Sequence, residues 1–178
     1  VHIDNAAAAR AVMEHLYALG HERIAVVGGP PDNPLHQQRL EGVRGAGKVR
    51  GRLRQLSIVP GDFSVESGHA AAMALLDGTS APTAIFCFSD QMALGTLAAC
   101  RELGIRVPED LSIVGFDDLA SSRYLTPPLT TIRQPMREIG ARAVNLLLAI
   151  IEQVDVPRQQ TLEFSLMVRG STAAPRRS

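Results

Sequence analysis

The sequence predicts an α/β protein whose helices cover both faces of a mostly parallel β-sheet, which is a three-layer sandwich. Two observations support this fold class. Short apolar runs alternate with amphipathic helical patterns at a spacing of roughly 30 residues, as in βα units joined by right-handed crossovers. The runs are apolar at consecutive positions, which is typical of strands buried on both faces of a parallel sheet.

The chain begins with a short extended segment, 1–5, that leads into a helix. Asp4 or Asn5 can cap this helix by accepting hydrogen bonds from its free N–H groups. The helix should continue to about Leu19, where Gly20 can end it in a left-handed conformation. Its apolar stripe consists of Ala9, Val12, Met13 and Leu16.

A buried strand at 24–27 comes next, closed by a tight turn at 28–31 that lacks the glycine spacing of a dinucleotide-binding loop. A second helix should begin near Leu35. Glycines and basic residues then crowd together, and each glycine costs a helix about 1 kcal/mol relative to alanine. We therefore predict a frayed helix or a mobile loop over 45–55. The basic side chains there favour a solvated surface over a nucleic-acid patch, because no aromatic residue interleaves them.

Two further βα units fill the middle of the chain. A short strand at 56–59 precedes a helix that Ser64 can cap. The next strand is 84–88, and the Ser-Asp pair at 89–90 can cap the helix that follows it. Gly104 should end that helix.

The segment Leu-Ser-Ile-Val-Gly-Phe-Asp-Asp at 111–118 predicts a buried strand that ends in two adjacent carboxylates. In open α/β sheets, ligands bind outside the carboxyl ends of the strands. Asp117 and Asp118 therefore lie where a polar small molecule would be held. Because neighbouring residues on a strand point to opposite faces, the two carboxylates cannot readily flank one bond of a substrate.

The pattern changes in the last third of the chain. An extended segment at 129–132 leads to Pro135, which suits the first turn of a long helix. That helix, 135–153, is apolar on more than one side, which predicts a covering surface beyond the one this chain supplies. A final strand is expected at 160–170, and residues 171–178 are expected to form a disordered tail.

Composition limits the possible functions. A chain of 178 residues suits one or two compact domains. Its 18 basic and 18 acidic side chains give a formal net charge of zero, which argues against a nucleic-acid surface in this segment. No apolar run reaches the roughly 20 residues that a membrane helix needs, and no signal peptide is visible. Cys87 and Cys100 are interpreted as reduced, packed thiols of a cytosolic protein.

The residues predict no catalytic centre, cofactor or metal. The five histidines show no spacing of metal ligands. The sequence contains no Gly-x-Ser-x-Gly elbow, and Ser89 lacks an evident general base. An enzyme is therefore the least favoured of the interpretations.

Short motifs along nearly the whole chain carry a further signal. They are Val-His-Ile-Asp-Asn at 1–5, Leu-Gly-His-Glu-Arg-Ile-Ala at 19–25, Arg-Leu-Glu-Gly at 39–42, Gly-Asp-Phe-Ser at 61–64, Ser-Asp-Gln-Met-Ala-Leu-Gly at 89–95, Gly-Phe-Asp-Asp at 115–118, Pro-Pro-Leu-Thr-Thr-Ile at 127–132 and Arg-Gly-Ser-Thr at 169–172. In this combination and order they resemble the effector-binding domain of the LacI/GalR family of bacterial transcription regulators.

The resemblance implies a two-lobed fold like that of type I periplasmic binding proteins. Residues 1–134, with the final strand at 160–170, would form most of the C-terminal lobe. The helix at 135–153 would belong to the N-terminal lobe. Most of that lobe and the DNA-binding helix-turn-helix domain are expected to lie outside this chain. This sequence differs from the family pattern between Gly45 and Leu56, where an alanine-rich amphipathic helix is usual in the family.

The resemblance also places Arg39, Phe63, Ser89 and Asp117 around the effector. Arg39 offers a planar fork of donors for hydroxyls or a carboxylate. Asp117 can accept two hydrogen bonds from vicinal hydroxyls, and Phe63 supplies a flat face for a sugar or base ring. Ser89 adds a short donor and acceptor at a strand end.

The expected partners follow from the same resemblance. They are a sugar or nucleoside effector bound between two lobes, a second copy in a homodimer, and operator DNA contacted by a domain outside this chain. Dimer contacts would come from the helix that starts at Asp90 and from 121–124. Asp90 is expected to cap that helix and Asp118 to brace its loop. The implied regulator is cytoplasmic, without a membrane partner; a periplasmic sugar receptor of a transporter is the alternative interpretation.

Overall fold

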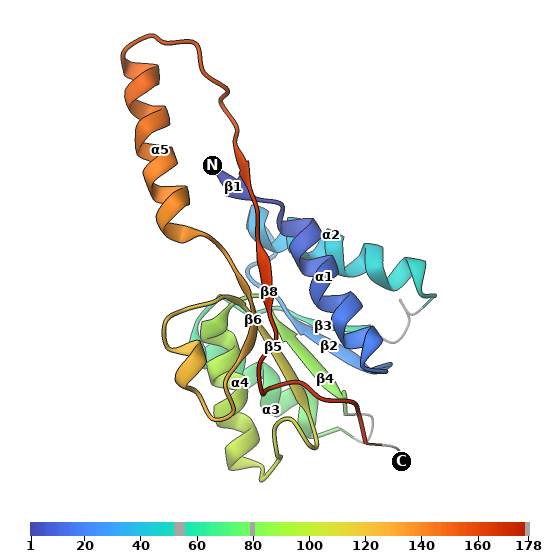
Figure 1. Ribbon diagram of the computed structural model, residues 1–178. Coiled ribbons are helices and arrows are strands. Elements are labelled where there is room, and N and C mark those ends of the chain that lie inside the picture. Colours follow the sequence, from blue (N-terminus) through green and yellow to red (C-terminus); the bar gives the residue numbers. More distant parts are fainter. Residues whose placement is uncertain (52–55, 79–80, 177–178) are drawn as a thin grey trace.

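A computed structural model describes residues 1–51, 56–78 and 81–176. Its main sheet has six strands in the order β3-β2-β4-β5-β6-β8, all parallel except for the antiparallel pair β6–β8. Helices α1 and α2 cover one face of the sheet, and α3 and α4 cover the other (Figure 1). The predicted three-layer α/β sandwich is therefore confirmed.

The elements have the following bounds. The strands are β1 His2–Ile3, β2 Ile24–Val27, β3 Leu56–Val59, β4 Ala84–Cys87, β5 Ser112–Asp117, β6 Thr130–Arg133, β7 Thr161–Leu162 and β8 Ser165–Met167. The helices are α1 Asn5–Ala18, α2 Pro34–Val49, α3 Val65–Leu76, α4 Asp90–Glu102, the 3-10 helix η2 Ser122–Tyr124 and α5 Met136–Ile151. The single final strand predicted at 160–170 is in fact two short strands, which pair with different partners.

The core lies between the central strands and the helices on both faces. Strands β2 and β4 are buried at every position, as their continuous apolar runs predict. Three fully buried aromatic side chains, Phe86, Phe88 and Phe116, are the largest groups in this core. Both cysteines are free and buried, as predicted.

Helices α1 and α2 pack closely because α2 carries glycines where it crosses α1. A Cβ atom at Gly42 would lie 2.1 Å from the carbonyl oxygen of Ala6, so a larger residue would push the helices apart. Helix α2 continues without a break through Gly45 and Gly47 to Val49, so the prediction of a frayed helix from residue 45 is wrong for that stretch. Tertiary contact outweighs the low helix propensity of glycine here. Residues 52–55 lie outside the described part of the chain.

Helices α3 and α4, on the opposite face of the sheet, also pack closely through glycines. A Cβ atom at Gly95 of α4 would lie 1.9 Å from the carbonyl oxygen of Val65, and one at Gly68 of α3 would lie 2.2 Å from that of Met92. The two helix backbones therefore approach each other along a line of small residues. This contact helps to position α4 against its face of the sheet.

The segment after Gly170 is ordered, contrary to the predicted tail, through residue 176. Ser171 is fully buried, and its hydroxyl donates to the Ile113 oxygen (2.6 Å) and accepts from the Thr130 nitrogen (2.8 Å). Arg176 pairs with Asp110 at 2.7 Å. The polar composition of this segment predicted disorder, but the Ser171 side chain pairs with backbone groups of the sheet. Residues 177–178 lie outside the described part.

We expect Ser171→Ala to lower the free energy of unfolding by about 2 kcal/mol, because it leaves two buried backbone groups without that partner. Urea unfolding followed by circular dichroism measures this change. Ser121→Ala, at an exposed position, should stay within about 0.5 kcal/mol of the parent. Equal stability of the two variants would show that the Ser171 contacts contribute nothing.

Helix α5 stands away from the sheet (Figure 1). None of its residues is buried, and it exposes large apolar side chains, namely Met136, Val144, Leu147, Leu148, Ile150 and Ile151. The chain returns from α5 through β7, which pairs in parallel with β1 at the start of the chain. In the described part of the chain, no helix has both the length and the apolar character needed to cross a membrane.

Candidate ligand-binding cleft

A cleft of about 430 Å³ opens at the carboxyl end of the sheet, next to the first turn of α5. Its lining comes from the chain start, from α2, from the loops after β3, β5 and β6, and from α5. The lining residues are Val1, His2, Ile3, Asn5, Leu35, Arg39, Phe63, Asp117, Leu119, Gln134, Met136 and Ile139. Three of the four predicted site residues, Arg39, Phe63 and Asp117, therefore meet in one cleft.

Arg39 projects from α2 and is only 3% exposed. Its Nε donates to Asn5 Oδ1 at 3.0 Å, its Nη1 donates to the Phe88 carbonyl oxygen, and its guanidinium lies 3.6 Å from the centre of the Phe116 ring. Its Nη2 lies 3.9 Å from Asp117 Oδ1. Burial lowers the pKa of Arg39 to about 10, so the side chain remains charged at neutral pH. Two of its five donors thus bind groups at the base of the cleft.

Asp117 ends β5 with a backbone φ of 121°, a conformation that L-residues rarely adopt. Its carboxylate accepts a 2.7 Å hydrogen bond from Gln134 Nε2, which comes from the loop after β6. Burial raises the pKa of Asp117 to about 6, although Arg39 and Gln134 act in the opposite direction. A partly desolvated carboxylate with a free acceptor direction toward the cleft suits hydroxyl groups of a ligand.

Phe63 also has a left-handed backbone, with φ of 70°, and its ring lies against the turn after β2. A Cβ atom at Gly29 would lie 2.0 Å from the ring atom Cζ of Phe63. Only glycine at position 29 lets the ring occupy this place at the side of the cleft. The flat face that the sequence predicts is therefore held in position by a glycine on another loop.

Ser89 does not line the cleft. Its hydroxyl accepts a 3.1 Å hydrogen bond from the Met92 nitrogen, and the side chain is 5% exposed, so Ser89 is the N-cap of α4. The predicted cap, Asp90, has a different role. Its carboxylate accepts hydrogen bonds from Leu119 N (2.8 Å), Ser122 Oγ (2.5 Å) and Thr131 Oγ1 (2.6 Å). Asp90 thus fixes the loop that follows Asp117.

Asp118 braces the loop, as predicted. Its two carboxylate oxygens pair with Arg133 (2.6 Å) and Arg169 (2.5 Å), whose guanidinium groups approach from β6 and from the segment after β8. These partners offset the burial of Asp118 and leave its pKa below the usual value. The two adjacent carboxylates therefore have different roles: Asp117 lines the cleft, and Asp118 stabilises the fold.

Several lining residues were not among the predicted site residues. Asn5 orients Arg39, Gln134 orients Asp117, and Met136 and Ile139 give the cleft an apolar wall from α5. The signal for Gln134 was its place directly after a strand. The α5 residues looked like the apolar stripe of an ordinary helix, so sequence reasoning gave no reason to choose them.

The arrangement can bind a small polar ring. One end offers a carboxylate, a buried guanidinium and an amide, and the sides offer an aromatic face and aliphatic groups. No group of three or more His, Cys, Asp or Glu side chains within 1–51, 56–78 and 81–176 is placed to hold a metal ion. Hydrogen bonding and ring contact are the interactions that these residues supply.

A mainly parallel sheet has its cleft at the strand ends, and α5 forms one side of that cleft before the chain returns to the sheet as β8. This arrangement defines a ligand-binding lobe of the periplasmic-binding-protein type. The sequence profile of the periplasmic binding protein-like domain family matches residues 13–172. The chain belongs to this family, in the form found in LacI-family transcriptional regulators.

Individual relatives agree with this assignment. The HTH-type transcriptional repressor CytR of Escherichia coli strain K12 is 43% identical over 176 residues, which cover 98% of this chain and 52% of CytR. PurR of Actinobacillus pleuropneumoniae is 42% identical over 162 residues, or 89% of this chain and 48% of PurR. The chain thus spans about half the length of these relatives.

Solved structures give the same family. A LacI-family regulator from Enterococcus faecium with bound ribose has a TM-score of 0.88 and 32% identity, covering 98% of this chain and 65% of that one. A dimeric Lac repressor with an 11-residue C-terminal deletion has a TM-score of 0.92 and 37% identity. The match covers 98% of this chain and 64% of that one. These relatives are regulators, which favours that interpretation over a transport receptor.

Proposed function

We propose that this chain is the effector-sensing part of a LacI-family repressor and that its cleft binds a small sugar or nucleoside. The observation that carries the proposal is the meeting of Arg39, Phe63 and Asp117 from three separate segments in one cleft. Asp117 would accept hydrogen bonds from vicinal hydroxyls of the ligand, and Phe63 would stack on the ligand ring. Arg39 would hold the Asp117 carboxylate in place. The ribose named for the E. faecium regulator is a ligand of this kind.

The proposed mechanism depends on the two sides of the cleft. One side is the carboxyl edge of the sheet, and the other is α5, through Met136 and Ile139. We propose that α5 belongs to a second lobe and that 1–134 with 160–170 forms the first. A ligand that contacts both sides changes their relative position only as far as it binds one arrangement more tightly than the other. In a dimer this change would alter the spacing of two DNA-binding domains.

The same proposal makes the protein a cytoplasmic regulator without catalytic activity. Its support is that the relatives compared are repressors and that Asp117 and Asp118 serve different purposes. Incubation with nucleosides and hexoses, followed by chromatography of the mixture, should return every compound unchanged. Turnover of any of them would contradict this part of the proposal.

Calorimetric titration tests the binding step. Cytidine, adenosine, ribose and a few hexoses are titrated into the full-length protein, and operator affinity is then measured at saturation with any compound that binds. We expect one compound class to bind and to change operator affinity. Binding without an effect on operator affinity would reject the regulatory part, and no binding would reject the effector class.

We expect Gly29→Ala to weaken effector binding about tenfold, because the new methyl group occupies the place of the Phe63 ring and the stacking contact is lost. Calorimetry against the compound identified above gives the dissociation constant. Gly78→Ala, at a glycine with open space around its Cβ position, is the matched control and should leave affinity unchanged. An unaltered affinity in Gly29→Ala would show that Phe63 does not contact the effector.

A further inference from the structure

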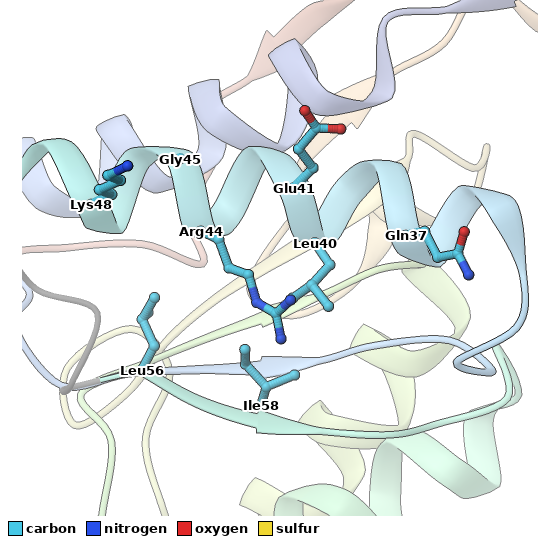
Figure 2. A pocket seen from close by; sticks show the side chains of 8 residues that line it. All are labelled: Gln37, Leu40, Glu41, Arg44, Gly45, Lys48, Leu56 and Ile58. Atoms are coloured by element: carbon cyan, nitrogen blue, oxygen red, sulfur yellow. The ribbon is translucent and has the colours of Figure 1, made fainter.

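A second and larger hollow, of about 860 Å³, lies on the outer side of α2, over the edge strand β3. Figure 2 shows Leu40 and Arg44 pointing from α2 toward Ile58 of β3, so that helix and strand form the two sides of a groove. Lys48 lies one helical turn beyond Arg44, above Leu56. The effector cleft uses the other side of the same helix, through Arg39.

The edge strand is open to pairing. Strand β3 hydrogen-bonds only to β2 among the described residues, so the N–H and C=O groups on its outer side lack a strand partner there. Its sequence is Leu-Ser-Ile-Val, which contains neither a charge nor a proline to discourage an added strand. Ile58 is 37% exposed on the groove side. These are the features to which an extended segment adds by β-augmentation.

The groove has a net positive charge, because its lining carries one carboxylate, Glu41, and two cations, Arg44 and Lys48. Arg44 and Lys48 both line it and are exposed, and no carboxylate of residues 1–51, 56–78 or 81–176 forms an ion pair with either. Figure 2 shows the carboxylate of Glu41 on the opposite side of α2 from the Arg44 guanidinium. Two unpaired cations above an apolar strand complement a carboxylate on an otherwise apolar segment.

We propose that this groove docks an extended, acidic segment of a partner protein, which adds to β3 and places a carboxylate against Arg44 and Lys48. A second copy of this chain fits poorly, because pairing two β3 edges would bring the cations of both copies together. Nucleic acid fits poorly as well, since the groove has an apolar floor and no aromatic group to stack on bases. The proposal goes beyond effector sensing and does not depend on it.

Two peptides probe the groove. The first is N-acetyl-Ile-Thr-Leu-Thr-Glu-Thr-amide, whose isoleucine, leucine and glutamate share one face when extended. The second has lysine in place of glutamate. Each is titrated into the uniformly ¹⁵N-labelled chain, and amide shifts give the site and the affinity. We expect shifts in residues 56–59 and at least about threefold tighter binding of the acidic peptide, as for an exposed ion pair.

A charge reversal separates docking from a general effect. The variant Arg44→Glu/Lys48→Glu should invert the preference, so that the lysine peptide binds more tightly. The matched control, Arg137→Glu/Arg158→Glu, makes the same charge change at exposed positions away from the groove and should keep the parent preference. The proposal is overturned by equal binding of both peptides, by shifts outside the groove, by absence of binding, or by duplex DNA binding there in place of the acidic peptide.

Discussion

Asp117→Asn should weaken effector binding about 100-fold at neutral pH. The substitution keeps the shape of the side chain but removes its charge, and each charge-assisted hydrogen bond contributes about 1.5–3 kcal/mol. Loss of two such bonds to vicinal hydroxyls would account for the expected change, since about 1.4 kcal/mol corresponds to a factor of ten. Calorimetric titration of the parent and the variant gives the ratio of dissociation constants.

The pH dependence provides an independent check of this role. Burial raises the pKa of Asp117 to about 6, so its carboxylate becomes protonated as the pH falls through that value. Affinity should therefore fall about tenfold between pH 7 and pH 5 in the parent and stay nearly level in Asp117→Asn. Asp77→Asn, an exposed position at the end of α3, should follow the parent profile. A parent profile as level as that of Asp117→Asn would mean that the ligand does not use this carboxylate.

Gly95→Ala should lower the free energy of unfolding by about 3 kcal/mol, although alanine is the better helix former. The added Cβ would lie 1.9 Å from the Val65 oxygen and 2.6 Å from the His69 nitrogen, so α3 and α4 must separate. For a chain of this size, a loss of about 3 kcal/mol corresponds to a fall in Tm of roughly 6–12 °C. Calorimetric melting measures the shift.

Gly140→Ala is the matched control for this effect. Gly140 lies in α5 with open space at its Cβ position, so only the backbone preference should count there. The variant should gain up to about 1 kcal/mol. Opposite signs for the two glycines are the expected result, and a stabilised Gly95→Ala would contradict the close approach of the helices.

Local sequence patterns predicted most of the fold. The apolar runs at 24–27, 84–87 and 113–114 lie in the buried centre of the sheet, because a strand that is covered on both faces is apolar at consecutive positions. Two of the errors, at 45–49 and after Gly170, share one cause. In both places, segments distant in the sequence stabilise residues whose local preference is for disorder. Helix α1 packs against α2, in which Ala46 and Gly47 are buried, and Ser171 pairs with backbone groups of β5 and β6.

The candidate site was predicted less completely. Motif resemblance placed Arg39, Phe63 and Asp117 together, and the structure brings all three to one cleft. The resemblance placed Ser89 beside the effector, whereas the structure makes it the N-cap of α4, the role that the Ser-Asp pair at 89–90 suggested. Contact between Ser89 and an effector stays a prediction. Gln134 and Met136 were missed because their place depends on how α5 leaves the sheet, which no short window of sequence records.

The exposed apolar side of α5 has a practical consequence for solution work. Side chains such as Leu147 and Ile151, which are 57% and 67% exposed, will favour self-association of this chain as its concentration rises. Sedimentation or light-scattering measurements on these 178 residues would then report contacts of that helix. A stoichiometry obtained in this way should be checked against a variant with polar residues at those two positions before it is assigned to the native assembly.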